Sequence, residues 1–291
     1  MLKEWPLVAF TVLGQTAVGV FWFFHLPFLV RGRLPAYGWR LAGLVVLAVV
    51  VLLTALAAAV SFFHLSHPFR ARRALGNLRS SWLSREILSE LLFLALAAAA
   101  AWLDGFRNPG PELERALLAA AGLAGLLFLF CMTKVYMLPS APAWRRISTP
   151  LAFLSTTLVA GAVTTELVVR LAAGPGVFEI DLMPAALVLI AVEIALAAVA
   201  APLGGLKGFR PAPSLRPNDG PPPFLHRARI VLLAAGFVSV AADIATGGND
   251  IMKERGAGPF LILAFLFVLA GEIAGRFHFY GLMPRPGDRR A

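Results

Sequence analysis

The sequence predicts an all-α membrane protein, a polytopic bundle of eight transmembrane helices. Hydrophobic residues make up 59% of the 291 residues and charged residues 14%, and the mean hydropathy is +0.78. Soluble domains average about 45–50% apolar and about 25% charged residues. The apolar residues fall into long runs that charged or proline-rich breaks separate. Each run is expected to be a helix, because an open strand in lipid would leave its backbone groups unpaired.

The predicted spans form a single integral membrane domain over residues 1–291. Most runs are close to the roughly 20 residues that cross a bilayer. The first run lacks the small-residue cleavage pattern of a signal peptide, so we expect it to be retained. A loop rich in proline and glycine, 208–223, separates the sixth and seventh spans because proline blocks helix continuation. In order, the spans are 6–30, 41–63, 87–103, 117–137, 150–171, 182–203, 230–245 and 260–280.

The distribution of basic residues predicts the orientation in the membrane. Eight spans place both termini on one side, and about 18 of the 26 Lys and Arg residues fall on that side, which favours the cytoplasm. A surface that docks a soluble subunit would be basic for its own reasons, and that alternative stays open. The net charge of +10 does not indicate nucleic-acid binding here, because the cations lie in connectors between spans.

The connector between the second and third spans carries the most informative group of residues. His64, His67 and Glu86 are predicted to meet at one membrane boundary, and Glu90 lies one helical turn further on. An imidazole that accepts a proton and a carboxylate that relays it suit the oxidation of a lipid-soluble quinol. Two plainer interpretations remain. His64 can cap a helix end, and Glu86 can interact with the dipole at the start of the third span.

Several ionisable residues lie deeper in the predicted spans: Glu166, Glu193, and Glu272 with Arg276. Such charges usually face the interior of a bundle and need a partner. The i,i+4 spacing of Glu272 and Arg276 favours an internal ion pair over a proton path. Glu193 has no evident local partner and is the best candidate for a functional group in the core. A small proton- or ion-coupled transporter that uses Glu193 or Glu166 is the alternative function, although its usual helix breaks are not indicated.

Residues near the ends of the spans have interfacial roles. Arginines in two connectors either determine topology or form a docking patch for an acidic partner surface: Arg70, Arg72, Arg73, Arg145 and Arg146. Four tryptophans are predicted to anchor span ends at the interface: Trp5, Trp39, Trp82 and Trp144.

The protein is not expected to carry its own redox centre. Its five histidines lie at depths that do not pair across the membrane centre, which argues against haem. Its single cysteine, Cys131, excludes a disulfide within the chain and a cysteine-bound iron–sulfur cluster. Electrons taken from a bound quinol would have to pass to a cluster that a partner supplies.

The chain resembles the membrane-anchor subunits (DmsC type) of the dimethyl sulfoxide reductase family of iron–sulfur molybdoenzymes. The resemblance covers essentially the whole length. It rests on the order and spacing of these residues: Glu4, Trp5, Pro6, Leu7, Phe10, Thr11, Gly14, Gln15, His64, Leu65, Pro68, Ser84, Glu86, Ile87, Tyr136, Trp144, Thr149, Pro150, Gly271, Glu272, Gly275, Arg276, Phe279, Tyr280 and Gly281.

The resemblance implies an eight-helix subunit of a complex for anaerobic respiration in the bacterial inner membrane. Such a subunit holds an iron–sulfur electron-transfer subunit and a molybdopterin catalytic subunit at the membrane, and it oxidises menaquinol for them. The family's quinol-site histidine falls on His64 and its glutamate on Glu86. The family usually has glycine after the His–Leu pair, whereas this sequence has Ser66 and then His67, which leaves open a second imidazole at the site. The terminal reduction itself would take place in the catalytic subunit.

Overall fold

A computed structural model gives the structure of the protein. Within the residues that it describes, every long element is an α-helix and no strand occurs, which confirms the predicted fold class. The described residues are 4–31, 37–62, 75–107, 110–137, 144–173, 181–203, 222–246 and 257–282.

Eight long helices and one short 3-10 helix make up the described part of the protein. Every predicted span corresponds to one of these helices, although several helices begin before the predicted boundary. They are α1 (Trp5–Arg31), α2 (Tyr37–Phe62), η3 (Leu75–Asn77), α4 (Trp82–Phe106), α5 (Pro111–Tyr136), α6 (Ser148–Ala173), α7 (Met183–Leu203), α8 (Pro223–Ala245) and α10 (Pro259–Gly281).

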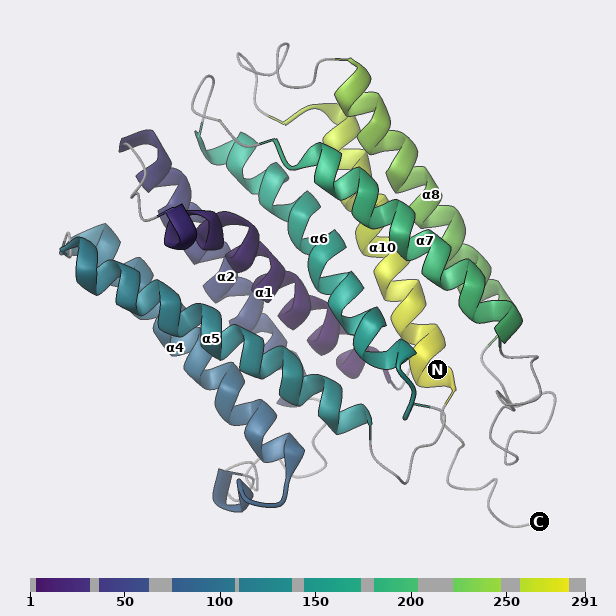
Figure 1. The fold of residues 1–291 in the computed structure, drawn as a ribbon, viewed down its shortest axis with the longest axis horizontal. Coiled ribbons are helices and arrows are strands. Elements are labelled where there is room, and N and C mark those ends of the chain that lie inside the picture. The colour runs from purple at the N-terminus through teal and green to yellow at the C-terminus, as the bar shows by residue number, and fades with distance from the viewer. Residues whose placement is uncertain are drawn as a thin grey trace.

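The helices form an up-and-down bundle in two groups around a central pair (Figure 1). Helices α1 and α6 run side by side through the middle, α2, α4 and α5 lie on one side of them, and α7, α8 and α10 lie on the other. The start of α1 and the end of α10 meet, since the Tyr280 hydroxyl lies 3.5 Å from the Leu7 carbonyl oxygen. We call this the near end of the bundle and the opposite one the far end.

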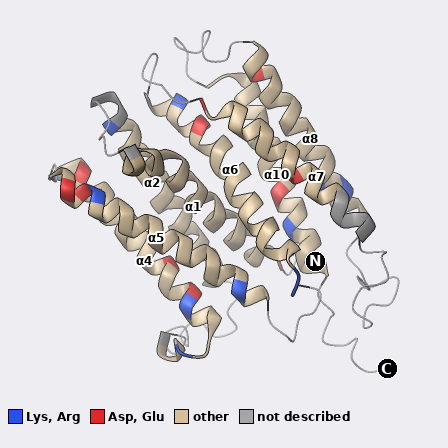
Figure 2. Cartoon of the chain, in the orientation of Figure 1, with Lys and Arg blue, Asp and Glu red and all other residues tan. Residues whose placement is uncertain are grey.

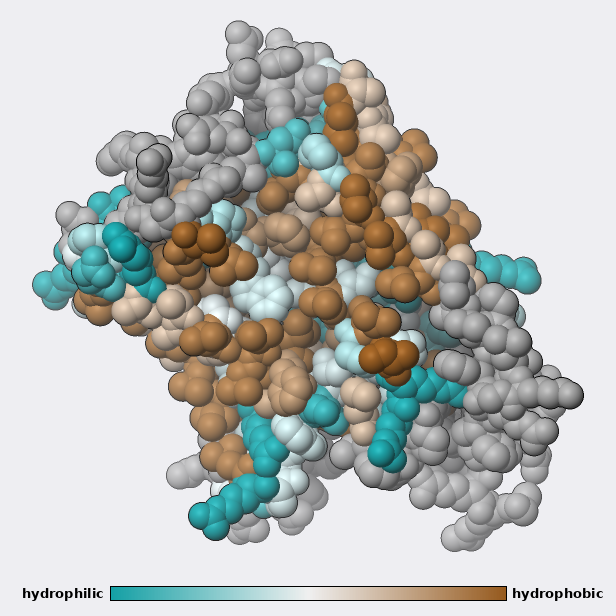
Figure 3. Space-filling model, in the orientation of Figure 1, coloured by the Kyte–Doolittle hydropathy of each residue, from teal (hydrophilic) through white to brown (hydrophobic). Residues whose placement is uncertain are grey.

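The length and composition of the helices fit a membrane. Seven described helices are long and apolar enough to cross a bilayer, and α7 contributes a shorter apolar stretch, Met183–Ala198. Figure 3 shows apolar side chains over the middle of the visible face, with hydrophilic ones gathered toward the ends of the helices. The protein is therefore a multi-pass membrane protein, as its composition predicted.

Two helix starts differ from the sequence prediction in ways that matter for the site. The Ser81 hydroxyl caps α4 by accepting a hydrogen bond from the Ser84 amide at 3.2 Å, so this helix begins at Trp82. Helix α8 begins at Pro223, because proline suits the first helical position. The sequence predicts a connector before Ile230, and this prediction is wrong for 223–229.

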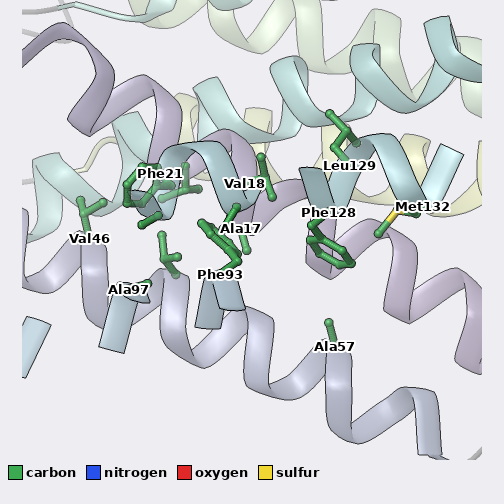
Figure 4. Packing of buried hydrophobic residues seen from close by; sticks show 14 of the residues in the cluster. Ala17, Val18, Phe21, Val46, Ala57, Phe93, Ala97, Phe128, Leu129 and Met132 are labelled. Atoms are coloured by element: carbon green, nitrogen blue, oxygen red, sulfur yellow. The ribbon is translucent and has the colours of Figure 1, made fainter. Parts of the chain in front are cut away.

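Buried apolar side chains form two clusters that share α6. The larger one fills the space among α1, α2, α4 and α5, where the rings of Phe21 and Phe93 meet edge to face at 5.6 Å (Figure 4). The smaller one includes Met183, Ile190 and Leu233 and joins α6 to α7, α8 and α10. The two groups of helices thus have separate cores, and the central pair holds them together.

Helices α1 and α6 touch backbone to backbone at two glycines. A Cβ atom on Gly161 would lie 2.6 Å from the Cα atom of Gly19, and one on Gly19 would overlap the carbonyl oxygen of Thr157. Small residues allow such close approach in membranes, where packing rather than the hydrophobic effect drives helix association. Neither glycine has room for a larger side chain unless the two helices move apart.

We predict that Gly161→Ala destabilises the bundle by about 1–3 kcal/mol, because the added methyl group forces the central helices apart. Thermal stability of the purified protein in detergent, followed by loss of the monodisperse size-exclusion peak, measures the effect. Gly105→Ala is the matched control, since a Cβ atom there would meet its nearest neighbour, on Leu44, at an ordinary 3.6 Å. A Gly161→Ala protein as stable as the control would contradict the close crossing.

Candidate functional site

Two glutamates one turn apart on α4 lie buried near the start of the helix. Glu86 is 2% exposed and Glu90 is 3% exposed. The Oε1 atom of each has no hydrogen-bond partner among the described residues. Buried polar groups are normally satisfied, and an unpaired carboxylate within a membrane is costly. In Figure 2, red marks acidic positions on α4 near the end of the bundle where this helix begins. These two atoms therefore call for a ligand, a proton or water.

The nearest cation in the sequence does not neutralise this pair. Arg85 donates instead to the carbonyl oxygens of Leu78 at 2.8 Å and Arg79 at 2.7 Å, and its guanidinium lies 4.2 Å from the ring centroid of Trp82. Within the described residues, none of the ion pairs includes Glu86 or Glu90. Among the described residues, the pair is thus a buried acidic site without a fixed positive partner.

Small polar and aromatic groups surround the glutamates. The Ser89 hydroxyl donates to the carbonyl oxygens of Arg85 at 2.8 Å and Glu86 at 3.0 Å. Cys131 and Tyr136 are buried on the last turns of α5, the helix that packs against α4. The site therefore lies between the first turns of α4 and the last turns of α5.

An aromatic cluster lies beside this site at the near end. The hydroxyl groups of Tyr280 and Tyr136 share a hydrogen bond of 2.8 Å, and both rings pack against Trp144. The Trp144 indole stacks on Phe279 at 5.2 Å and donates its Nε1–H to the Phe279 carbonyl oxygen at 2.9 Å. The prediction of Trp144 as an interfacial anchor is wrong, because its ring is enclosed by α5, α6 and α10.

The rest of the predicted quinol connector lies outside the described residues. This holds for His64 and His67 and for three of the predicted docking residues, Arg70, Arg72 and Arg73. The elements that flank the connector are described: α2 ends at the near end, and η3 precedes α4 there (Figure 1). The predicted roles of these five residues stay predictions.

Glu193 has a charged partner on another helix that the sequence did not indicate. Arg229 of α8 pairs with the Glu193 carboxylate, and its Nη2 atom also lies 3.9 Å from Oε2 of Glu272. That same oxygen accepts a hydrogen bond from the Thr156 hydroxyl at 2.6 Å. Arg229 was placed in a connector because the start of α8 was predicted too late. The two prolines before α8 and the need of a buried glutamate for a cation were the available signals.

The predicted ion pair between Glu272 and Arg276 does not form. Arg276 donates from Nη2 to Gln15 at 2.7 Å and to Thr156 at 3.0 Å, and its guanidinium lies 4.1 Å from the ring centroid of Phe153. The Thr156 hydroxyl therefore stands between the two charged groups and hydrogen-bonds to both. Spacing alone could not reveal this, because the intervening group comes from α6.

A second arginine cluster lies toward the far end. Arg170 donates to Glu166 at 2.7 Å and contacts Asp243 of α8 at 2.9 Å. The other oxygen of Glu166 accepts a hydrogen bond from the backbone amide of Leu182 at 3.0 Å. All three charged side chains are buried. Glu166 therefore serves as a clamp between α6 and the start of α7, which favours the structural interpretation over a proton path.

Three of the five histidines lie among the described residues, one in α1 and two at the near end. His25 is buried in α1, where it stacks on Phe21 at 4.8 Å. The rings of His226 and His278 lie 5.3 Å apart where α8 begins and α10 ends, at the near end. His226 was predicted to lie in a connector and instead belongs to the first turn of α8.

The two remaining docking residues lie at the near end, between α5 and α6. Arg145 is exposed, and Arg146 is partly exposed. Their position is compatible with the predicted docking surface, which stays a prediction.

These features define a multi-pass helical membrane protein with a buried pair of glutamates, Glu86 and Glu90, at one end of the bundle. The family model described as "DMSO reductase anchor subunit (DmsC)" matches residues 1–282, and the protein belongs to this family. Three similar proteins support the assignment.

The C subunit of the anaerobic dimethyl sulfoxide reductase of Escherichia coli (strain K12) is 32% identical over 283 residues, which are 96% of this sequence and 94% of that protein. The anaerobic dimethyl sulfoxide reductase subunit YnfH of the same organism is 30% identical over 297 residues, 96% and 94% of the two proteins. The anaerobic dimethyl sulfoxide reductase C subunit of Haemophilus influenzae (strain ATCC 51907 / DSM 11121 / KW20 / Rd) is 28% identical over 288 residues, 97% and 95% of the two proteins.

We predict that Arg170→Leu destabilises the bundle by about 3–5 kcal/mol, because two buried carboxylates lose their cation. Thermal unfolding of the purified protein in detergent measures the loss. The control is Arg115→Leu, which removes a longer contact of 3.8 Å to the largely exposed Glu112. If both variants melt together with the wild type, the clamp is not needed for stability.

Proposed function

We propose that this protein is the membrane anchor and menaquinol-oxidising subunit of a dimethyl sulfoxide reductase-type complex. Membership of the anchor-subunit family establishes the coarser role and implies catalytic and electron-transfer partners. The quinol-oxidising role is supported above all by Glu86 and Glu90, which are buried at the near end and each have an oxygen without a partner among the described residues.

The chemistry requires acceptors for both products of oxidation. Menaquinol loses two electrons and two protons when it becomes menaquinone. In this proposal the imidazole of His64 accepts one proton and the Glu86 carboxylate the other, while His67 and Glu90 relay protons away from them. The two electrons pass to an iron–sulfur cluster of a partner that docks at the near end, and from there to the molybdopterin subunit.

The fold gives a lipid-soluble substrate a way to this site. Leu83 and Leu91 of α4 are 47% and 43% exposed, so apolar surface adjoins the buried glutamates. The isoprenoid tail of a quinol can remain in lipid there while its ring reaches the end of α4. The ring's hydroxyl groups would then meet the unpaired carboxylate oxygens.

The position of the site also fits transfer to a soluble partner. Glu86 and Arg145 both belong to the near end, where the basic connectors collect and where we propose that the partner subunits dock. By the charge bias this end faces the cytoplasm of a bacterial inner membrane. The described helices run without breaks, so no observation favours the alternative of a transporter, a class that often uses broken helices.

We predict that His64→Ala and Glu86→Gln each lower the rate of quinol oxidation by about 100-fold, the usual contribution of a positioned acid or base. The complex should still assemble, because Glu86 is buried within the bundle and neither residue belongs to the proposed docking surface. Menaquinol-analogue oxidation by the purified complex measures the rate, and co-purification of the partner subunits measures assembly.

Two controls make this test specific. Oxidation of a reduced viologen dye, which reaches the partner subunits directly, should be unchanged in both variants. Glu112→Gln changes an exposed carboxylate at the far end and should leave quinol oxidation at its original rate. Full quinol-dependent activity in both site variants would refute the proposed role.

Docking of the partner subunits at the near end can be tested separately from quinol oxidation. Arg145→Glu places a negative charge on the near end and should weaken co-purification of the partner subunits several-fold, with a larger effect at low salt. Arg107→Glu, an exposed change at the far end, is the matched control. Equal assembly of the two variants at low salt would remove Arg145 from the docking surface.

A further inference from the structure

The carboxylates of Glu193 and Glu272 converge on one guanidinium, since Nη2 of Arg229 pairs with Oε1 of Glu193 and lies 3.9 Å from Oε2 of Glu272. One oxygen of each is already engaged, Oε1 of Glu193 by Arg229 and Oε2 of Glu272 by Thr156. The other oxygens, Oε2 of Glu193 and Oε1 of Glu272, find no donor among the described residues. A carboxylate only accepts hydrogen bonds, so two ionised groups cannot bond to each other. Among the described residues, Arg229 is the one cation that ion-pairs with these two carboxylates, so the second carboxylate must bind a proton or remain an uncompensated buried charge.

We propose that Glu193 and Glu272 share one proton and form a carboxyl–carboxylate pair between α7 and α10. The bound proton is the ligand of this site. The site lies in the group formed by α7, α8 and α10, whereas Glu86 and Glu90 belong to the other group of helices. The proposal is independent of quinol oxidation.

The charges around the pair agree with a single proton. Arg229 of α8 is the one described cation within 4.0 Å of these carboxylates, so one positive charge meets one shared negative charge. Arg276 is held apart from Glu272 by Thr156 of α6 and bonds to the neutral Gln15 of α1.

Two imidazoles lie on the near-end side of Arg229. His226 precedes Arg229 by one turn of α8, and His278 lies beside it on α10 with a ring-to-ring distance of 5.3 Å. Nε2 of His226 is buried without a partner among the described residues. Neutral imidazole both donates and accepts, and a buried water with polar partners can complete such a path. We therefore infer that the proton exchanges with the near end past His226 and His278.

Infrared difference spectroscopy of the purified full-length protein tests the shared proton. A protonated carboxyl group gives a C=O stretching band that shifts in D2O. The band of this pair should disappear in Glu193→Gln and in Glu272→Gln. It should persist in Glu166→Gln, the matched control, because that carboxylate is bound by Arg170 and a backbone amide. If neither site variant loses a band, the proposal is overturned.

Thermal stability gives a second test that does not depend on assigning a band. A glutamine can replace the protonated member of the pair, because its amide donates to the remaining carboxylate and leaves Arg229 one anionic partner. Each single variant should therefore melt near the wild type, while the double variant Glu193→Gln/Glu272→Gln should be much less stable. Single variants that are as unstable as the double variant, or that fail to fold, would show two fixed anions and refute the proposal.

The exchange path has its own test. His226→Leu and His278→Leu should keep the carboxyl band but slow its shift in D2O several-fold, because the polar connection to the near end is interrupted. Glu86→Gln should leave the rate of this shift unchanged, which separates the path from the proposed quinol site. An unaltered exchange rate in both histidine variants would refute the path.

Discussion

The structure depends on burying arginine charges inside a membrane bundle. Arg170, Arg229 and Arg276 lie within helices, where an unpaired charge is costly, so each must meet acceptors on neighbouring helices. Apolar side chains alone cannot select these neighbours, because lipid tails are as apolar as leucine. Arg170 joins α6 to α8, Arg229 joins α8 to α7, and Arg276 joins α10 to α1 and α6. The arginines therefore determine which helices of the second group pack together.

The glycine crossing makes the arginine contacts possible. Because α1 and α6 touch at Gly19 and Gly161, the neighbouring turns of the two helices bring Gln15 and Thr156 within reach of one guanidinium, that of Arg276. The same stretch of α10 then reaches the other group of helices through Tyr280, which hydrogen-bonds to Tyr136 of α5. The central pair and α10 thus link the two groups of helices that carry the buried acidic sites.

The sequence predicted the fold well and the partners of the buried charges poorly. Hydropathy identifies a span wherever apolar residues continue for long enough, so each of the eight spans could be placed. It fails at helix ends that contain charges, which is why the first turns of α8, with Arg229, were assigned to a connector. It also cannot give the rotation of one helix against another. That rotation places Thr156 between Glu272 and Arg276 and encloses Trp144 within the bundle.

The two pairs of buried glutamates differ in their surroundings, and this difference separates their roles. Glu193 and Glu272 have fixed donors, Arg229 and Thr156, that define one arrangement of a shared proton. The pair on α4 has neither an ion-pair partner nor a donor for its free oxygens among the described residues. A site without fixed donors stays open to a substrate hydroxyl that supplies its own proton, whereas a site with fixed donors retains a proton of its own. On this argument the α4 pair suits a transient ligand, and the pair between α7 and α10 suits a resident one.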